Sequence, residues 1–347
     1  MFKRSILLTA TVAVTSPFFA SLAAAQTAGS PSSVAIIGLV DVYAGKLQRS
    51  NEAGSVSAIN SGGLNTSFWG FTGSEDLGNG LRAQFMLESF FQADTGAQGR
   101  NATDPGFSKN AWVGLSSRNW GTLRLGRQTN PLFLATGAAN PFGTSLAVSP
   151  LVLHTWSPAY NRAVIGDSVW DNSVSYTTPT FSNLRLTAQH AFGEVAHRSG
   201  RNNTNLTLNY GNGPLQIVAS AQRAKIGPGF VATIDSQNVA MAGLAYDFGA
   251  VRAFASTQRA RTPNVGLTTK TTQLGATVPL GLGRIQASVA RSNRDLDSGA
   301  DTKRTTAALG YEHILSKRTD LYAVLLRDRL TGFSSHNSYL AGVRHRF

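Results

Sequence analysis

Apolar and polar residues alternate along most of this chain, in segments of about ten residues separated by turn-forming residues. Side chains of a strand point alternately to its two faces, so this period of two predicts β-strands with one apolar and one polar face. In the last segment one face would carry Tyr339, Ala341, Val343, His345 and Phe347, and the other Leu340, Gly342, Arg344 and Arg346. The pattern predicts an all-β protein.

The alternation predicts sixteen strands, an even number in the size range in which a closed antiparallel barrel encloses an aqueous channel. Short connections, such as 211–213 and 247–249, alternate with longer ones, such as 47–63 and 93–106. This alternation predicts periplasmic turns at one end, where both chain termini lie, and external loops at the other. The predicted strands are 34–46, 64–73, 80–92, 107–116, 121–128, 169–178, 183–193, 203–210, 214–225, 236–247, 250–261, 269–278, 283–293, 303–314, 319–330 and 336–347.

A soluble β-sandwich with one solvated face is the alternative fold for such alternation. Two features favour a membrane barrel. The apolar faces are small and aliphatic, and the segments have the length that a tilted membrane-spanning strand requires, about nine to eleven residues. A backbone in lipid must satisfy its hydrogen bonds internally, so strands of this kind close into a barrel. We therefore expect a sixteen-stranded antiparallel transmembrane β-barrel.

One connection, from about 129 to 168, is far longer than the others and rich in apolar residues such as Phe133, Leu151 and Trp156. Loops of this length are usually functional or disordered, and the apolar composition argues against disorder. We expect this third external loop to fold into the lumen and narrow it. A cap over the rim and a contact between subunits are the alternatives.

The N-terminus has the features of a cleaved signal peptide. Lys3 and Arg4 precede a mostly apolar stretch, and Ala23 and Ala25 match the small residues before a cleavage site. A membrane-anchoring helix is the alternative, but Pro17 interrupts the stretch, which is short for a span. The expected organisation is a signal peptide over 1–25 and one barrel domain over 26–347.

Composition narrows the function further. The chain has no cysteine, which excludes a disulfide scaffold and thiolate metal sites. The formal net charge is +13, but the basic residues are scattered singly rather than clustered as in a nucleic-acid-binding surface. We expect no nucleic-acid partner, and place the charge in a pore or at a lipopolysaccharide-rich surface.

Several motifs resemble the trimeric general porins of Gram-negative bacteria, in particular their betaproteobacterial branch. The resemblance extends over the whole mature chain and rests on the segments SVAIIGLVD (33–41), GFTGSEDLGNGLRA (70–83), AWVGL (111–115), GTLRLGRQ (121–128), DNSVSY (171–176) and GVRHRF (342–347). It implies an outer-membrane homotrimer, each subunit a water-filled pore narrowed by its third external loop. It also implies contacts with outer-membrane lipid and lipopolysaccharide, and assembly through a C-terminal strand that ends in Phe347.

The resemblance also implies a constriction in which arginines on the wall face acidic groups on the loop. Arg127 falls on one wall arginine of the family and Arg162 lies near the spacing of another; Arg82 and Arg124 are expected to face inward as well. The loop turn corresponds to Asn140, Pro141, Phe142 and Gly143, without the acidic residue expected there.

Two positions depart from the family pattern. Phe68 stands where an arginine is usual, and Asn110 occupies a position that is often basic. Because alternation points Phe68 inward, an apolar ring is expected to line part of the pore.

The resulting functional hypothesis is a passive diffusion channel for small hydrophilic solutes and ions, with a mild anion preference and no cofactor. A surface receptor or adhesin is a second hypothesis, and a membrane enzyme a third. None of the six histidines has metal-site spacing, and His154, in the long loop, lacks a nucleophile motif. We therefore expect His154 to be a solvated loop residue and the protein not to be an enzyme.

Overall fold

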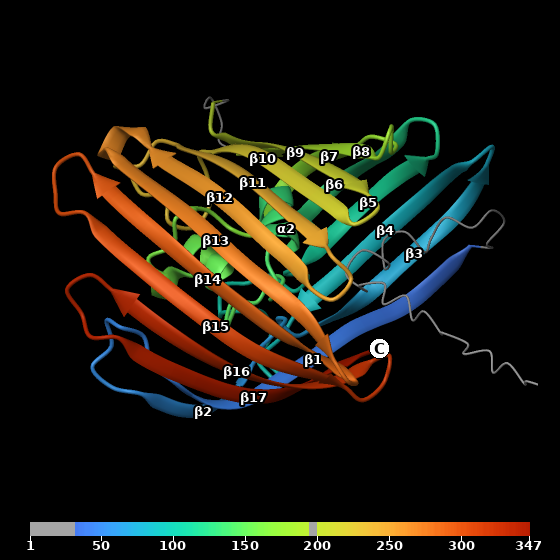
Figure 1. Cartoon of the computed structure of the whole chain (residues 1–347). Helices are drawn as coiled ribbons and strands as arrows, with labels where there is room; N and C mark the ends of the chain where they lie inside the picture. The colour runs from blue at the N-terminus through green and yellow to red at the C-terminus, as the bar shows by residue number, and fades with distance from the viewer. Residues whose placement is uncertain (1–31, 194–199) are drawn as a thin grey trace, which may run out of the picture.

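A computed structural model describes residues 32–193 and 200–347 (Figure 1). The predicted signal peptide, 1–25, lies outside the described residues. The strands are β1 (Ser33–Leu47), β2 (Val56–Ser61), β3 (Phe68–Gly78), β4 (Leu81–Phe90), β5 (Asn110–Ser117), β6 (Gly121–Thr129), β7 (Val169–Thr177), β8 (Leu184–Phe192), β9 (Asn202–Asn212), β10 (Leu215–Ala224), β11 (Gln237–Asp247), β12 (Arg252–Thr262), β13 (Leu267–Leu280), β14 (Gly283–Leu296), β15 (Thr302–Ile314), β16 (Thr319–Leu330) and β17 (His336–Arg346). The helical segments are α2 (Pro131–Ala138), α3 (Pro150–Trp156), η1 (Pro158–Tyr160) and η2 (Pro263–Val265). Within these residues no helix has the length and apolar character to cross a membrane.

All the strand pairings are antiparallel, and the sheet closes where β1 pairs with β17. Strand β1 pairs on its other edge with two strands, β2 along its second half and β3 along its first. Together β2 and β3 form a single interrupted barrel strand, which gives the closed sixteen-stranded barrel that alternation predicts. Closure continues to the C-terminus, where the backbones of Gly38 and Phe347 exchange two hydrogen bonds of 3.0 Å.

The predicted strands agree with the observed ones within about three residues, except for the second. That strand was expected over 64–73, but the chain is extended over Val56–Ser61, leaves the sheet at 62–67 and resumes at Phe68. The earlier half lies in what was predicted to be a loop. Alternation does not detect an interruption of this kind, because the residues on both sides of it keep the strand pattern.

The alternation along each strand separates an outer from an inner face. On β16, Leu321 and Leu325 are exposed on the outside, whereas Tyr322, Val324 and Leu326 are buried on the inside. Apolar outward positions on a closed barrel are those that contact lipid. The inward face of the sheet carries both the polar residues of the wall and the apolar residues that the long loop covers.

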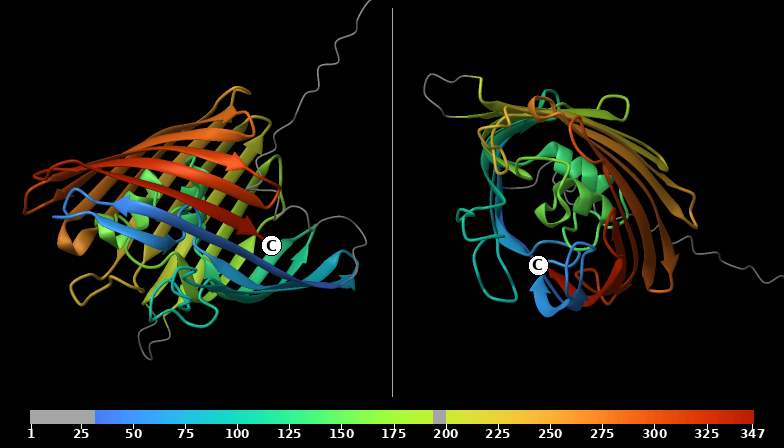
Figure 2. Two further views of the ribbon diagram at one scale, coloured as in Figure 1. Left: turned by 90° about the horizontal axis from the view of Figure 1, so that it is seen from below. Right: turned by 90° about the vertical axis from the view of Figure 1, so that its left-hand side faces the viewer.

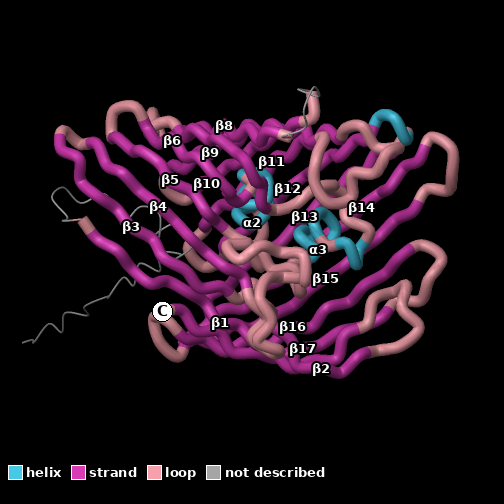
Figure 3. The backbone as a smooth tube through the Cα atoms, turned by 180° about the vertical axis from the view of Figure 1, so that it is seen from behind, coloured by secondary structure: helices cyan, strands magenta, loops and turns pink. Residues whose placement is uncertain are grey.

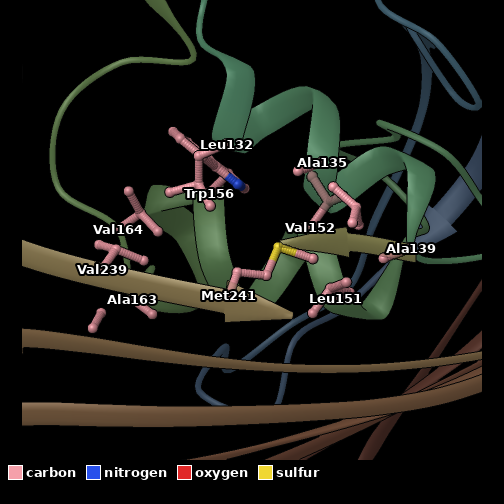
Figure 4. Packing of buried hydrophobic residues seen from close by; sticks show 12 residues of the cluster. Leu132, Ala135, Ala139, Leu151, Val152, Trp156, Ala163, Val164, Val239 and Met241 are labelled. Atoms are coloured by element: carbon pink, nitrogen blue, oxygen red, sulfur yellow. The ribbon is translucent and has the colours of Figure 1, made fainter. Parts of the chain in front are cut away.

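The long loop, residues 130–168, lies within the ring of strands, as the end-on view in Figure 2 and the rear view in Figure 3 show for α2 and α3. Asn130 and Ser149 cap the two helices, each followed by a proline that fits the first helical position. One apolar cluster joins α2 and α3 to Val218, Val239 and Met241 of the wall (Figure 4). The loop is therefore packed against the inner wall rather than suspended in the channel.

Candidate functional site in the channel lumen

The loop turn at 140–143 is organised by Asn140, whose side chain bridges several backbone groups. Its Oδ1 accepts from the backbone N–H of Phe142 at 2.9 Å, and its Nδ2 donates to the Gly143 carbonyl at 2.9 Å. The Pro141 carbonyl accepts from Gln286 Nε2 on β14 at 2.5 Å, and Phe142 is buried against the apolar wall near β16. These contacts fix the turn to the β14–β16 side of the barrel.

A second group of residues lies on the inner face of β3–β5. The register pairs Phe68 with the inward-facing Leu39, and pairs Glu88 with the inward-facing Asn110. Lys109 Nζ lies 3.3 Å from the centroid of the Phe68 ring and 2.7 Å from Glu88 Oε1. Asn110 Nδ2 donates to the other carboxylate oxygen at 2.5 Å.

This group contains one cation and one carboxylate, so it is electrically balanced. Phe68 and Asn110 were anticipated as lumenal, but Lys109 and Glu88 were not singled out. The alternation along β4 was sufficient to place Glu88 on the inner face. The contact with Lys109 was not predictable, because Lys109 lies in the connection before β5.

Arg82 and Arg124 face inward near the short-turn end of the barrel. The Arg124 guanidinium stacks 4.5 Å from the centroid of the inward-facing Trp112 ring. Its Nε is buried and has no hydrogen-bond partner within the part of the chain that the structure describes. Arg82 pairs in register with Asp76, with 3.9 Å between Nη2 and Oδ2, and Arg185 faces inward from β8.

Arg127 was expected to face the lumen beside Arg124, but in the structure it lies on the outer side of β6. The register sets Arg127 opposite Ala111, on the outer side that also carries Val113 and Leu125. Its guanidinium donates to the Ser108 carbonyl at 2.8 Å and to Asp171 Oδ1 at 2.5 Å. Arg124 and Arg127 are three positions apart, so in a strand of period two they lie on opposite faces.

Arg162 lies beyond the wall strands, near the end of the long loop. Its Nη2 donates to the carbonyl of Pro228, which belongs to the external connection between β10 and β11, at 2.9 Å. The structure therefore does not bring Arg127 and Arg162 together with Arg82 and Arg124 into one cluster.

An arginine that sequence reasoning missed, Arg100, ties the β4–β5 connection to the long loop. It forms a forked contact with both oxygens of Asp104 and both oxygens of Asp167, at 2.7–2.9 Å. Burial opposes ionisation of these carboxyls, but the Arg100 guanidinium holds the pKa of Asp104 and the pKa of Asp167 below the usual value. The arginine carries one charge against two, so this contact is net negative.

His154 is buried, with 2% of its surface exposed, which corrects the expectation of a solvated loop residue. Its Nδ1 lies 2.8 Å from Ser292 Oγ and its Nε2 2.8 Å from Thr306 Oγ1, so it joins α3 to β14 and β15. Burial, reinforced by the charge of Arg304, lowers the pKa of His154 to about 3. The ring is therefore neutral at pH 7 and serves as an uncharged bridge.

A chain of alternating charges runs along the inner face of β14–β17. Arg284 contacts Glu312 at 2.7 Å, Glu312 contacts Arg344 at 2.9 Å, Arg344 contacts Asp320 at 3.0 Å, and Asp320 contacts Arg346 at 2.8 Å. Three arginines and two acids make up this chain, and the carboxylate of Asp41 on β1 lies opposite Arg344 in the register. The chain of charges includes Arg344 and Arg346, which alternation had placed inward.

A cavity of about 430 Å³ lies between the long loop, β1, β2, β16, β17 and the segment after β4. Leu146 and Val148 of the loop contribute apolar lining, and Arg49 and Arg100 contribute polar lining. A cavity thus remains between the loop and this part of the wall.

Comparison with known proteins identifies this architecture. A family model described as Gram-negative porin matches residues 9–332. The chain belongs to the Gram-negative porin family. The porin is 31% identical to "Outer membrane porin protein 32" of Delftia acidovorans, over 94% of this chain and 93% of that protein. It is 28% identical to an outer membrane porin protein of Bordetella pertussis, over 95% of this chain and 97% of that protein.

A solved structure described as "Anion-selective porin from Comamonas acidovorans" superposes with a TM-score of 0.76 at 27% identity, covering 91% of this chain and 100% of that chain. The porin is accordingly an outer-membrane protein of Gram-negative type that forms a passive channel. Family membership implies a channel rather than an enzyme.

Proposed function

We propose that this porin passes small hydrophilic solutes and ions with a mild preference for anions. The observation that carries the proposal is the excess of inward-facing arginine near the short-turn end. Arg124 faces the lumen there from β6, and Arg185 faces it from β8. Fixed positive charge in a pore raises the local concentration of anions. The similar solved structure described as anion-selective supports the same assignment.

Reversal potentials in a salt gradient across a planar bilayer test the ion preference. We expect a potential of the sign produced by a modest excess of chloride over potassium permeability. A cation-selective potential would refute the anion preference while leaving the channel itself intact. Complete absence of conductance steps would instead favour a plugged receptor.

We propose that the constriction is formed by the long loop with its turn at 140–143 on one side, and by Phe68, Asn110, Arg82 and Arg124 on the other. Phe68 contributes an apolar ring and no charge, and the charge of Lys109 beside it is balanced by Glu88. The anion preference is therefore expected to arise deeper in the pore, at the arginines, rather than at Phe68.

We further propose a homotrimer. An apolar hollow of about 530 Å³ on the outer side of the barrel is lined by Trp69, Phe107 and Phe347, among others. These three side chains are substantially exposed, and aromatic side chains are enriched at protein interfaces. Detergent-solubilised protein is expected to have the mass of three subunits, and a monomeric mass would refute this assignment.

The remaining expectations stay proposals with their own tests. Cleavage near Ala25 is checked by N-terminal sequencing of the mature protein, and lipopolysaccharide contact by its co-purification. Dependence on the barrel assembly machinery through the last strand is checked by removing Phe347 and measuring folded protein in the outer membrane. Absence of catalysis is supported by His154, because both ring nitrogens are engaged by hydroxyls of the wall.

A further inference from the structure

The interrupted barrel strand poses a problem of hydrogen bonding at 62–67, a segment that we call the shelf. The N–H of Gly62 still donates to the Asp41 carbonyl at 2.7 Å, but the chain then leaves the sheet, and the following backbone N–H groups lose their ladder partners. Unpaired backbone groups inside a membrane barrel are costly. The shelf therefore requires other acceptors.

The carboxylate of Asp41 supplies them. Its oxygens accept from the backbone N–H groups of Gly63 at 3.1 Å, Leu64 at 2.9 Å and Asn65 at 2.8 Å. The Tyr322 hydroxyl of β16 also donates to it. Asp41 lies on β1 and is fully buried, and these four donors converge on its carboxylate.

The shelf in turn contacts the loop tip, residues 140–148 of the long loop. The Gly63 carbonyl accepts from Ser145 Oγ at 2.6 Å. Ser145 Oγ also accepts from the backbone N–H of Val148 at 2.9 Å, so one hydroxyl both orders the tip and attaches it. Leu64 belongs to the same apolar cluster as Phe142 and Val148.

We infer that Asp41 is a positioning residue for the channel constriction: it holds the shelf inside the barrel, and the shelf holds the loop tip. The inference rests on the proposed role of the long loop as the constriction. Asp41 acts on the loop tip through Gly63 and Leu64. Arg344 adds a second support, because its Nη1 donates to the Asn65 side chain at 2.5 Å.

Two variants separate positioning from general stability. Asp41→Asn keeps the size of the side chain but replaces one acceptor oxygen with a donor that faces backbone N–H groups. Ser145→Ala removes the attachment of the tip and leaves the shelf and its carboxylate untouched. Thr187→Val is the matched control, because it removes a hydroxyl pair with Thr177 on the wall at 3.1 Å, away from the shelf.

Two measurements are made on the full-length porin in membranes or detergent. Hydrogen exchange is expected to accelerate at 142–148 by about tenfold or more in Asp41→Asn and in Ser145→Ala, the size expected for loss of a charge-assisted or buried hydrogen bond. Exchange in the strands is expected to match the wild type. Single-channel records of both variants are expected to show more frequent brief current fluctuations than those of the wild type or Thr187→Val.

The inference would be overturned if Ser145→Ala matched the wild type both in hydrogen exchange at 142–148 and in the frequency of current fluctuations. This outcome would count even if Asp41→Asn failed to fold. Accelerated exchange throughout the strands of a folded Asp41→Asn would also overturn it, because Asp41 would then be a general structural residue. If instead the proposed constriction is wrong, hydrogen exchange at 142–148 accelerates in both variants but neither variant changes the single-channel current.

Discussion

Lys109 places its ammonium nitrogen 3.3 Å from the centroid of the Phe68 ring, in the pore wall position where related sequences are expected to carry arginine. A cation over an aromatic face is stabilised by the ring quadrupole, and Glu88 completes the contact at 2.7 Å. The Lys109 ammonium group is thus held between the Phe68 ring and the Glu88 carboxylate.

Replacing this ring with a charge should change ion selectivity. Phe68→Arg is expected to raise the ratio of anion to cation permeability by roughly two- to threefold, because it adds one positive charge to a screened aqueous lumen. Reversal potentials measure the ratio, and Phe68→Leu, which removes the ring without adding charge, is the control. An unchanged ratio in Phe68→Arg would contradict a lumenal position for residue 68.

Arg124 should contribute to anion preference through its charge. Arg124→Gln is expected to lower the anion-to-cation permeability ratio by a similar factor, whereas Arg124→Lys keeps the charge and should retain most of it. Arg127→Gln provides a comparison, since Arg127 lies on the outer side of the same strand. Equal losses in Arg124→Gln and Arg127→Gln would argue against the lumenal assignment of Arg124.

Acid should weaken the attachment of α3 to the wall. The pKa of His154 is lowered to about 3 in the folded loop, below the value of about 6.5 for a free histidine. A detached loop takes up a proton below pH 6.5 and the attached loop does not, so attachment is complete above that pH. It weakens as pH falls toward 3, by at most about 1.4 kcal/mol per pH unit.

Channel closures are therefore expected to become more frequent between pH 6 and pH 4. His154→Gln retains hydrogen-bonding groups but does not titrate, and its closures should depend less on pH over this range. Identical pH dependence in the wild type and in His154→Gln would show that His154 is not responsible.

The contact of Arg100 with two aspartates should fail at a lower pH. Because Arg100 holds the pKa of Asp104 and the pKa of Asp167 below their usual value, the contact is fully present above about pH 4 and is lost as pH falls through the lowered values. Protease cleavage within 91–109 is expected to rise below pH 4, with an acid-stable protease. Arg100→Gln should be cleaved at neutral pH as well; resistance of that variant would contradict the role of the contact.

The barrel was predictable from the local pattern, because alternate residues of each strand face the lipid and the interior of the barrel and differ in polarity accordingly. At the end of the chain, for example, Arg344 lies on the inner face and Phe347 on the outer face. The shelf was not predictable, since its stability depends on Asp41 meeting Gly63 across strands and Tyr322 from the other end of the chain.

The candidate site likewise contains residues that the strand pattern predicts and residues that it does not. The inward position of Phe68 is predictable from strand parity, and that of Arg124 agrees with parity, whereas Asn110 is a candidate only from its family position. Arg127 was expected to face inward only from its family position, whereas its position in the strand places it on the outer face. His154 was misjudged because its partners, Ser292 and Thr306, are 138 and 152 residues away along the chain. The local composition around His154 cannot show that two hydroxyl groups so distant in the chain will contact its ring.

The connection between Asp41 and Tyr322 also bears on the order in which the channel is built. Asp41 belongs to the first strand and Tyr322 to the penultimate one, so their hydrogen bond can form only after the two ends of the chain have met. The support for the loop tip is thus completed by closure of the seam. A barrel that has not yet closed lacks the Tyr322 donor to Asp41, so the full set of contacts that supports the loop tip exists only in the closed barrel.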